Sequence, residues 1–294
     1  METSHHKVIL ASILVLGAEF CFAGVSALVK YLSTDLPPEQ LVFFRNLTAL
    51  LVLLPWLWRK GPAAFKTKAW RFHLTRGLAG VIATYLFFYS IAHLPLAQAT
   101  LVLMLSPFII PIMGKIWLDE HVNRQTWLAI SVGFVGVFIF LNPQHTELSP
   151  IIAVAFAAAC LSAYTKTLIR QMSVTESPSK IVFYFAGIST LVSGISLLWR
   201  GEAVASEHWL AIIAMGLFAV GGQLGMTKAF ALAPAARVGV FTYSSIIFAA
   251  IMGYWFWDEP ITVSMLLGAA IIITAGYLAI RTRRKAESGH KVGS

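Results

Sequence analysis

A carboxylate inside a long apolar segment is the first candidate for chemistry in this chain. Glu19 lies near the middle of the first such segment. An acid at this depth of a membrane is costly unless it is paired, protonated or hydrated. We therefore predict that Glu19 holds a proton or binds a substrate ammonium. The alternative is a protonated or hydrogen-bonded packing residue.

Two arginines also lie within apolar segments, at Arg45 and Arg76. Arginine stays charged, so it must pair, contact backbone carbonyls or face water. Arg45 either forms a structural ion pair with Glu19 or a carbonyl cluster, or captures a substrate carboxylate through its guanidinium fork. Arg76 either guards the mouth of a cavity or reaches lipid headgroups. Both are candidate substrate-binding residues.

An amide stands among three glycines in the segment 208–232. Gly221, Gly222 and Gly225 weaken a helix in its middle, and Gln223 lies between them. Backbone groups freed at this depth must be satisfied by protein or by a cavity. A substrate site explains the glycines, and so does close helix packing through small residues. Gln223 is a candidate substrate contact.

A serine–proline step and a polar patch occupy matching depths. Ser106 precedes Pro107, which removes a helical hydrogen bond and bends the helix. The stretch 242–245 offers hydroxyl groups, with Tyr243 and Ser245 as the candidates. Aromatic rings that carry hydroxyls can stack on a flat substrate or its cation; the further candidates of this kind are Tyr85, Tyr89 and Tyr164.

The acid pairs Asp119-Glu120 and Asp258-Glu259 each precede an expected helix. Carboxylates there cap free N–H groups and complement the helix dipole, so we assign capping rather than catalysis. The chain has no phosphate-binding loop and no nucleophile or metal motif in a plausible context. We predict no catalytic residue, no cofactor, no metal and no enzymatic activity.

The elements that position these residues are ten apolar segments. The chain is 58% hydrophobic and 12% charged, its mean hydropathy is +0.76, and a helix spans the bilayer with about 20 apolar residues. An all-α integral membrane protein of ten transmembrane helices is predicted. The expected spans are 8–30, 38–58, 71–92, 95–117, 124–142, 148–170, 180–199, 208–232, 235–257 and 261–281.

The basic net charge of +9 has a topological explanation. If the N-terminus is cytoplasmic, most lysines and arginines fall in cytoplasmic connections, whereas the outer loops hold most of the acids. This asymmetry orients helices during insertion. We predict a multi-pass protein of the inner membrane with both termini cytoplasmic, and no nucleic-acid partner.

The second half of the chain repeats the first. Shifted by 139 residues, Cys21 coincides with Cys160, Ser106 with Ser245, and the acid pair at 119 with that at 258. Five is an odd number of spans, so the two repeats have opposite orientations, as in secondary transporters. We expect one repeat over 1–146, a second over 147–285, and a cytoplasmic tail over 286–294.

The repeated unit resembles the EamA family of the drug/metabolite transporter superfamily. The resemblance is carried by LPLAQATLVLMLSPFIIPIMGKIWLDEHV and APAARVGVFTYSSIIFAAIMGYWFWDEPI, and by FFRN at Phe43–Asn46. It implies a central cavity lined by spans 1, 3, 4, 6, 8 and 9, with the other spans bracing them or forming a dimer. Arg45 stands on a bracing span, which favours its structural interpretation.

The resemblance implies transport of small organic metabolites. Together with an acid, arginines, amides, hydroxyls and rings, it predicts a secondary transporter of amino acids or amino-acid derivatives. We expect export or exchange by alternating access, with a proton as a candidate coupling ion. The alternative is a multidrug exporter of lipophilic cations. The lipid bilayer is the expected environment, and a homodimer is an expected partner state.

Overall fold

The computed structural model describes residues 2–59, 61, 66–118, 124–142, 149–172, 175–232 and 239–290. Within these residues every regular element is a helix. The elements are α1 (Glu2–Leu32), α2 (Pro38–Arg59), α3 (Trp70–His93), α4 (Leu96–Leu103), α5 (Ser106–Leu118), α6 (Arg124–Leu141), α7 (Ile151–Met172), α8 (Pro178–Arg200), η2 (Ser206–His208), α9 (Trp209–Leu232), η3 (Gly239–Tyr243), α11 (Ser244–Trp257) and α12 (Val263–His290).

These helices correspond to the ten predicted spans. Two of the spans are broken, one into α4 and α5 and the other into η3 and α11. In the described residues, six helical stretches are long and apolar enough to cross a membrane, and two shorter ones, Trp127–Leu141 and Val263–Leu278, are also apolar. Large apolar side chains cover the outside, among them Leu210 and Trp255, which are 80% and 73% exposed. Such a surface requires lipid rather than water.

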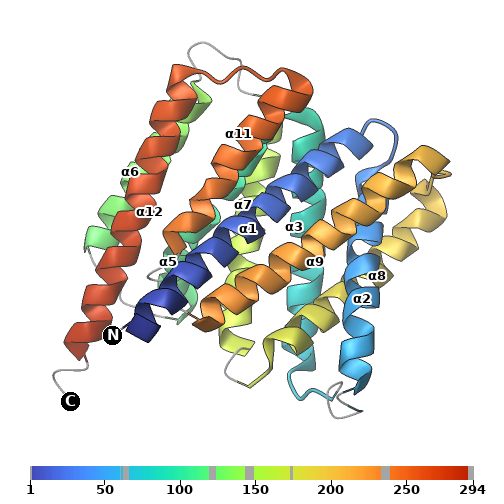
Figure 1. Cartoon of the computed structure of the whole chain (residues 1–294), viewed down its shortest axis with the longest axis horizontal. Helices are drawn as coiled ribbons and strands as arrows, with labels where there is room; N and C mark the ends of the chain where they lie inside the picture. The colour runs from blue at the N-terminus through green and yellow to red at the C-terminus, as the bar shows by residue number, and fades with distance from the viewer. Residues whose placement is uncertain are drawn as a thin grey trace.

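The packing of the helices follows the sequence repeat. The first span of each repeat packs against the third span of the other, as α1 on α9 and α7 on α3. The second spans, α2 and α8, pack together, and so do the last, α6 and α12. Figure 1 shows α6 beside α12 and α1 beside α9. Exchanging the repeats leaves this scheme unchanged, which is the two-repeat organisation expected from the sequence.

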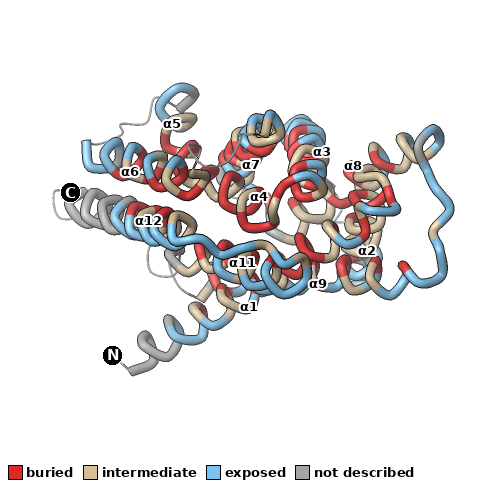
Figure 2. The backbone as a smooth tube through the Cα atoms, turned by 90° about the horizontal axis from the view of Figure 1, so that it is seen from above, coloured by how far each residue is buried: buried red, intermediate tan, exposed pale blue. Residues whose placement is uncertain are grey.

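The helices form two layers. Seen from above in Figure 2, α6, α7 and α3 lie in one layer, and α12, α11, α1 and α9 lie in the other. Buried residues line the space between the layers, and exposed residues face outward. α1 begins and α12 ends at the same end of the bundle (Figure 1). α12 continues beyond the predicted span to His290, into the polar tail.

The bend predicted at Pro107 is a complete break in the helix. α4 ends at Leu103 and α5 begins at Ser106, with a turn between them. Proline has no N–H to donate and clashes with the preceding turn, so a continuous helix is disfavoured here. The break leaves the Leu105 carbonyl to accept from Phe108 N–H at 2.9 Å. It brings the serine before Pro107 to the interior of the bundle.

The three glycines of α9 do not break their helix. α9 is continuous from Trp209 to Leu232. A Cβ at Gly222 would lie 2.7 Å from the Phe22 ring of α1, and one at Gly225 would lie 3.4 Å from Ala18 Cβ. Of the two interpretations of the glycines, close packing against α1 is therefore the one that the geometry supports.

Candidate functional site

A cavity of about 840 Å³ lies between the two layers. Its walls come from α1, α3, α4–α5, α7, α9 and η3–α11, the spans expected to line a central site. Four other helices add one lining residue each, namely Arg45 of α2, Ile130 of α6, Phe185 of α8 and Gly276 of α12. The polar and charged residues of the wall include six predicted site residues: Glu19, Arg45, Arg76, Gln223, Tyr243 and Ser245.

One region of the cavity holds an acid and an amine. Glu19 is only 5% exposed, lies beside Ser245 and interacts electrostatically with Lys166. Lys166 Nζ donates to Ser106 Oγ at 2.7 Å. Ser106 and Ser245 are equivalent positions of the two repeats, so each serine supports a charged residue from the opposite repeat. The side chain of Lys166 is exposed, and the space that it faces is the cavity inside the bundle.

A second region holds the two arginines. Arg76 is 8% exposed, and its guanidinium lies 3.9 Å from the centroid of the Phe185 ring. Arg76 Nε and Nη1 and Arg45 Nε are buried without a hydrogen-bond partner among the described residues. The two guanidinium groups line the same cavity, together with Phe185, and as like charges they disfavour each other. Of the alternatives for Arg45, the ion pair with Glu19 does not form among the described residues, where no carboxylate lies within ion-pair distance of Arg45.

Rings and an amide complete the wall. Tyr243 is 3% exposed and packs beside Phe108, with ring centroids 6.2 Å apart. A Cβ at Gly276 would collide with this tyrosine ring, so glycine makes room for it. Gln223 lines the cavity and also a small adjoining pocket that contains Arg45. The wall is thus aromatic and apolar with few polar groups, which is typical of small-molecule sites.

Four predicted residues lie elsewhere. Ser106 lies behind Lys166, fully buried. Tyr85 lies 3.5 Å from Ser196 Oγ through its hydroxyl. Tyr89 is 41% exposed and its ring lies 4.2 Å from that of His93. Neither of these tyrosines lines the cavity, and Tyr164 does not line it either. On a helix, a tyrosine reaches the interior only from one face, and the sequence does not specify which face that is.

Lys166 is the charged lining residue of the cavity that was not predicted from the sequence. It lies four residues before Arg170, at the end of an apolar span, where a lysine usually extends toward the headgroups. The signal was available, because its equivalent in the first repeat is Ala27. A charge present in one repeat and absent from the other is not required by the fold, and Glu19 shows the same pattern, since its equivalent in the second repeat is Ala158.

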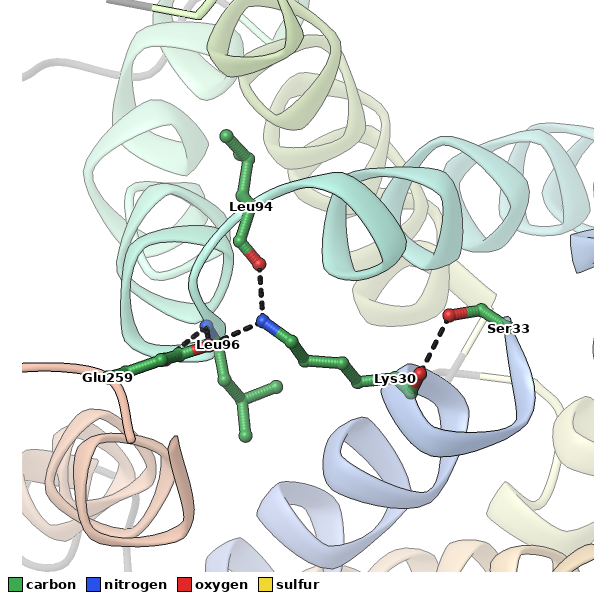
Figure 3. A network of polar contacts seen from close by, with 5 residues as sticks. All are labelled: Lys30, Ser33, Leu94, Leu96 and Glu259. Carbon is green, nitrogen blue, oxygen red and sulfur yellow. Dashed lines mark hydrogen bonds and ion pairs between the residues drawn. The ribbon is translucent and has the colours of Figure 1, made fainter. Parts of the chain in front are cut away.

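A network of charges joins the two repeats at one end of the cavity. Figure 3 shows Lys30 of α1 between Glu259, its ion-pair partner, and the carbonyl of Leu94, which accepts at 2.9 Å. Leu96 N–H, at the start of α4, donates to Glu259 Oε2 at 2.8 Å. The prediction that this acid caps a helix is confirmed, but the predicted helix was the wrong one. Glu259 caps α4 rather than α12, because the chain folds it back over the other repeat.

The first helical turn of α12 is capped instead by Thr262, whose hydroxyl accepts from Met265 N–H at 3.3 Å. The left-handed conformation of Asp258 (φ 52°) turns the chain so that Glu259 points toward α4. A Cβ at Gly253 would collide with Glu259 Oε2, which explains a glycine at this position. The acid pair 119–120 and the corresponding cap lie outside the described residues.

A second polar cluster lies at the other end of α3. Glu176 accepts from Thr67 Oγ1 and pairs with Lys180 at 2.8 Å. Lys180 also donates to the Lys66 carbonyl at 2.8 Å. Burial raises the pKa of Glu176, but the hydrogen bonds from Lys180 and Thr67 outweigh it, so the pKa lies below the ordinary value of 4.5. This Glu176 cluster also joins the two repeats.

A cavity with charged groups in a largely apolar wall, enclosed by two repeats in a bundle with an apolar outer surface, is the architecture of a membrane transporter. The chain belongs to the EamA-like transporter family, whose model matches residues 9–142 and again 149–281. The relatives of this chain are transporters, and it is a transporter rather than an enzyme.

Three curated relatives match nearly the whole chain. The pseudopaline exporter CntI of Pseudomonas aeruginosa is 32% identical over 271 residues, covering 91% of this chain and 94% of the exporter. The S-adenosylmethionine uptake transporter of Rickettsia felis is 29% identical, with 88% of each chain covered. The riboflavin transporter of Vibrio cholerae is 28% identical, with 93% of each covered.

A crystal structure of another protein has the same fold. It superposes with a TM-score of 0.69 at 17% sequence identity, covering 94% of this chain and 98% of that one. At this identity the likeness concerns the architecture of the bundle. The three named relatives carry chemically different cargo. Membership of the family therefore indicates metabolite transport, and the class of cargo has to be inferred from the residues that line the cavity.

Proposed function

We propose that this protein is a secondary transporter of a carboxylate-bearing amino-acid derivative across the bacterial inner membrane. The observation that carries the proposal is the charge composition of the cavity, since one acid, Glu19, and three bases, Lys166, Arg45 and Arg76, are its charged lining residues in the described part of the chain. An acid and an amine side by side suit the ammonium and carboxylate of a zwitterion. The aromatic wall suits an apolar part of the same molecule.

The same charges disfavour the alternative of a multidrug exporter for lipophilic cations. A cationic drug would meet a single carboxylate and three positive groups in one low-dielectric space. Like charges brought together there are strongly unfavourable. A substrate with at least one carboxylate instead gains charge-assisted hydrogen bonds from the same groups.

Alternating access is the mechanism that the repeats favour. The Lys30 network and the Glu176 cluster each join one repeat to the other, and they lie at opposite ends of α3. Opening one end of the cavity requires one of these sets of contacts to separate. We propose that the two sets separate in turn, so that the site opens to one side at a time.

The direction that we propose is export. The relative with 32% identity is named an exporter, whereas the S-adenosylmethionine transporter of Rickettsia felis is named for uptake. Glu19 is the proposed coupling residue, since it is an acid inside the membrane beside the amine with which it interacts. Proton binding to Glu19 would then compete with binding of the substrate ammonium.

The test is transport by purified protein in liposomes. A thermal-shift screen of amino-acid derivatives first selects those that raise the melting temperature, since a ligand of the folded state stabilises it. Counterflow of a selected compound, labelled, is then measured for wild type and Glu19→Gln. We expect counterflow in the wild type and loss of transport or of its pH dependence in the variant. Counterflow of lipophilic cations that is insensitive to amino-acid derivatives would overturn the proposal.

A further inference from the structure

The two arginines of the cavity lack an acidic partner within the described part of the protein. Arg76 Nε and Nη1 and Arg45 Nε are buried and make no hydrogen bond among the described residues. A buried donor without an acceptor costs more free energy than a typical hydrogen bond contributes. Arg76 is held over Phe185 by its flat face, which leaves the edge of the guanidinium to bind a ligand.

The arginines form a pole that is separate from Glu19 and Lys166. Arg76 lies over the Phe185 ring of α8, and Arg45 lines a small pocket together with Phe185. Lys166 instead donates to Ser106 of α5, and Glu19 lies beside Ser245 of α11. The cavity therefore offers two charged regions, of which the first already matches the ammonium and carboxylate of an amino acid.

A substrate with a single carboxylate would neutralise only one of the two positive charges of Arg45 and Arg76. Two guanidinium groups that repel each other are best neutralised by two negative charges. We propose that Arg45 and Arg76 form a subsite for additional acidic groups, so that the substrate class is amino-acid derivatives with two or more carboxylates. This inference rests on the proposed function, because the amino-acid part is assigned to Glu19 and Lys166.

The subsite can be tested by itself with small probes. Succinate carries two carboxylates at neutral pH, and succinamate has the same length with one of them replaced by an amide. Melting of the purified full-length protein is followed against each probe at constant ionic strength. We expect succinate to raise the melting temperature in a saturable manner and succinamate to bind at least about tenfold more weakly, since a charged hydrogen bond is lost.

Variants assign this effect to the arginines. Arg76→Gln and Arg45→Gln should abolish the succinate shift, whereas Arg76→Lys keeps the charge and should restore part of it. The matched control is Arg71→Gln, an exposed arginine at the start of the same helix, stacked on Trp70. Size-exclusion profiles and ligand-free melting temperatures identify any variant that does not fold, and Arg76→Lys then provides the comparison.

Three results would overturn the subsite. They are equal shifts with succinate and succinamate, a succinate shift that survives both glutamine variants, and a shift with inorganic phosphate but none with succinate. Failure of the proposed function has a different signature, because it is measured by counterflow of amino-acid derivatives and by Glu19→Gln. Glu19→Gln should leave the succinate shift in place, since Glu19 belongs to the other pole.

Discussion

Lys30 and Glu259 form an ion pair that joins the first repeat to the second, 229 positions apart in the sequence. Their side chains are 15% and 12% exposed, so water screens the pair only partly. The carboxylate also caps α4, and the ammonium also holds the Leu94 carbonyl (Figure 3). This one pair therefore fixes the start of α4, the helix that comes before the break at Pro107.

The first prediction concerns this pair. In Lys30→Met, the partner that remains for the Glu259 carboxylate among the described residues is the Leu96 N–H. We expect the contact between the two repeats at this end of the cavity to lose about 1–3 kcal/mol. A cysteine at Ala83, inside the cavity, should then be labelled faster by an impermeant reagent from this side. Asp258→Asn, next to the pair but outside it, is the control. Unchanged labelling in Lys30→Met would show that the pair does not restrict access.

The second prediction uses the glycine beneath Glu259. Gly253→Ala places a methyl group against the present position of Glu259 Oε2, so the carboxylate must leave the α4 cap. We expect Gly253→Ala to lower the melting temperature in the wild type and to have a much smaller effect in Glu259→Ala, where the clash is gone.

Gly187→Ala on α8 is the matched control, because a Cβ at this glycine would have no neighbouring atom within 4 Å and alanine favours a helix. It should be neutral or slightly stabilising. Equal losses from Gly253→Ala in both backgrounds would refute the assigned contact between this glycine and the carboxylate.

The third prediction concerns pH. The pKa of Glu176 lies below 4.5 in the folded protein, so this carboxylate stabilises the fold above pH 4.5. The stabilisation is lost as the pH falls through the folded pKa. Glu176→Gln should therefore melt below the wild type at pH 7, and the difference should shrink below pH 4.5. The exposed Glu202→Gln is the control. A difference that grows toward acid pH would contradict the sign.

The fourth prediction concerns orientation. The bias of lysines and arginines toward one side of the membrane predicts that both ends of the chain lie in the cytoplasm. A reporter that is active only outside the cytoplasm, fused after Arg284, should therefore stay silent, whereas a cytoplasmic reporter at the same position should be active. The opposite pattern would place the Lys30 network on the cytoplasmic side instead of the outer side.

The fold was largely predictable from the sequence. Apolar length and the repeat at a spacing of 139 residues determine ten spans in two units, and Pro107 indicates where one of them breaks. These are local signals, because helix formation in a membrane depends on residues close together in the chain. The acid Glu19 and the hydroxyl at Ser245 were also predicted at the cavity, where they lie.

The rest depends on contacts between distant segments. That Glu259 caps α4 follows from how two repeats meet, and nothing near position 259 encodes it. The isolation of Arg45 from Glu19, and its position beside Arg76, are likewise consequences of packing between α2 and α3. Tyr89 illustrates the same limit of sequence-based prediction. It lies at the expected depth, but its side chain points away from the cavity.

The central claim is that the cavity opens to one side of the membrane at a time. The direct measurement replaces Cys21 and Cys160 by alanine, places single cysteines at Ala83 or Met226 in the cavity wall, and labels each from either side with impermeant reagents. The account predicts that a saturating ligand speeds labelling from one side while it slows labelling from the other, because a ligand redistributes states that it binds differently. Fast labelling from both sides at once, together with ion conductance, would mean a channel and would contradict the account.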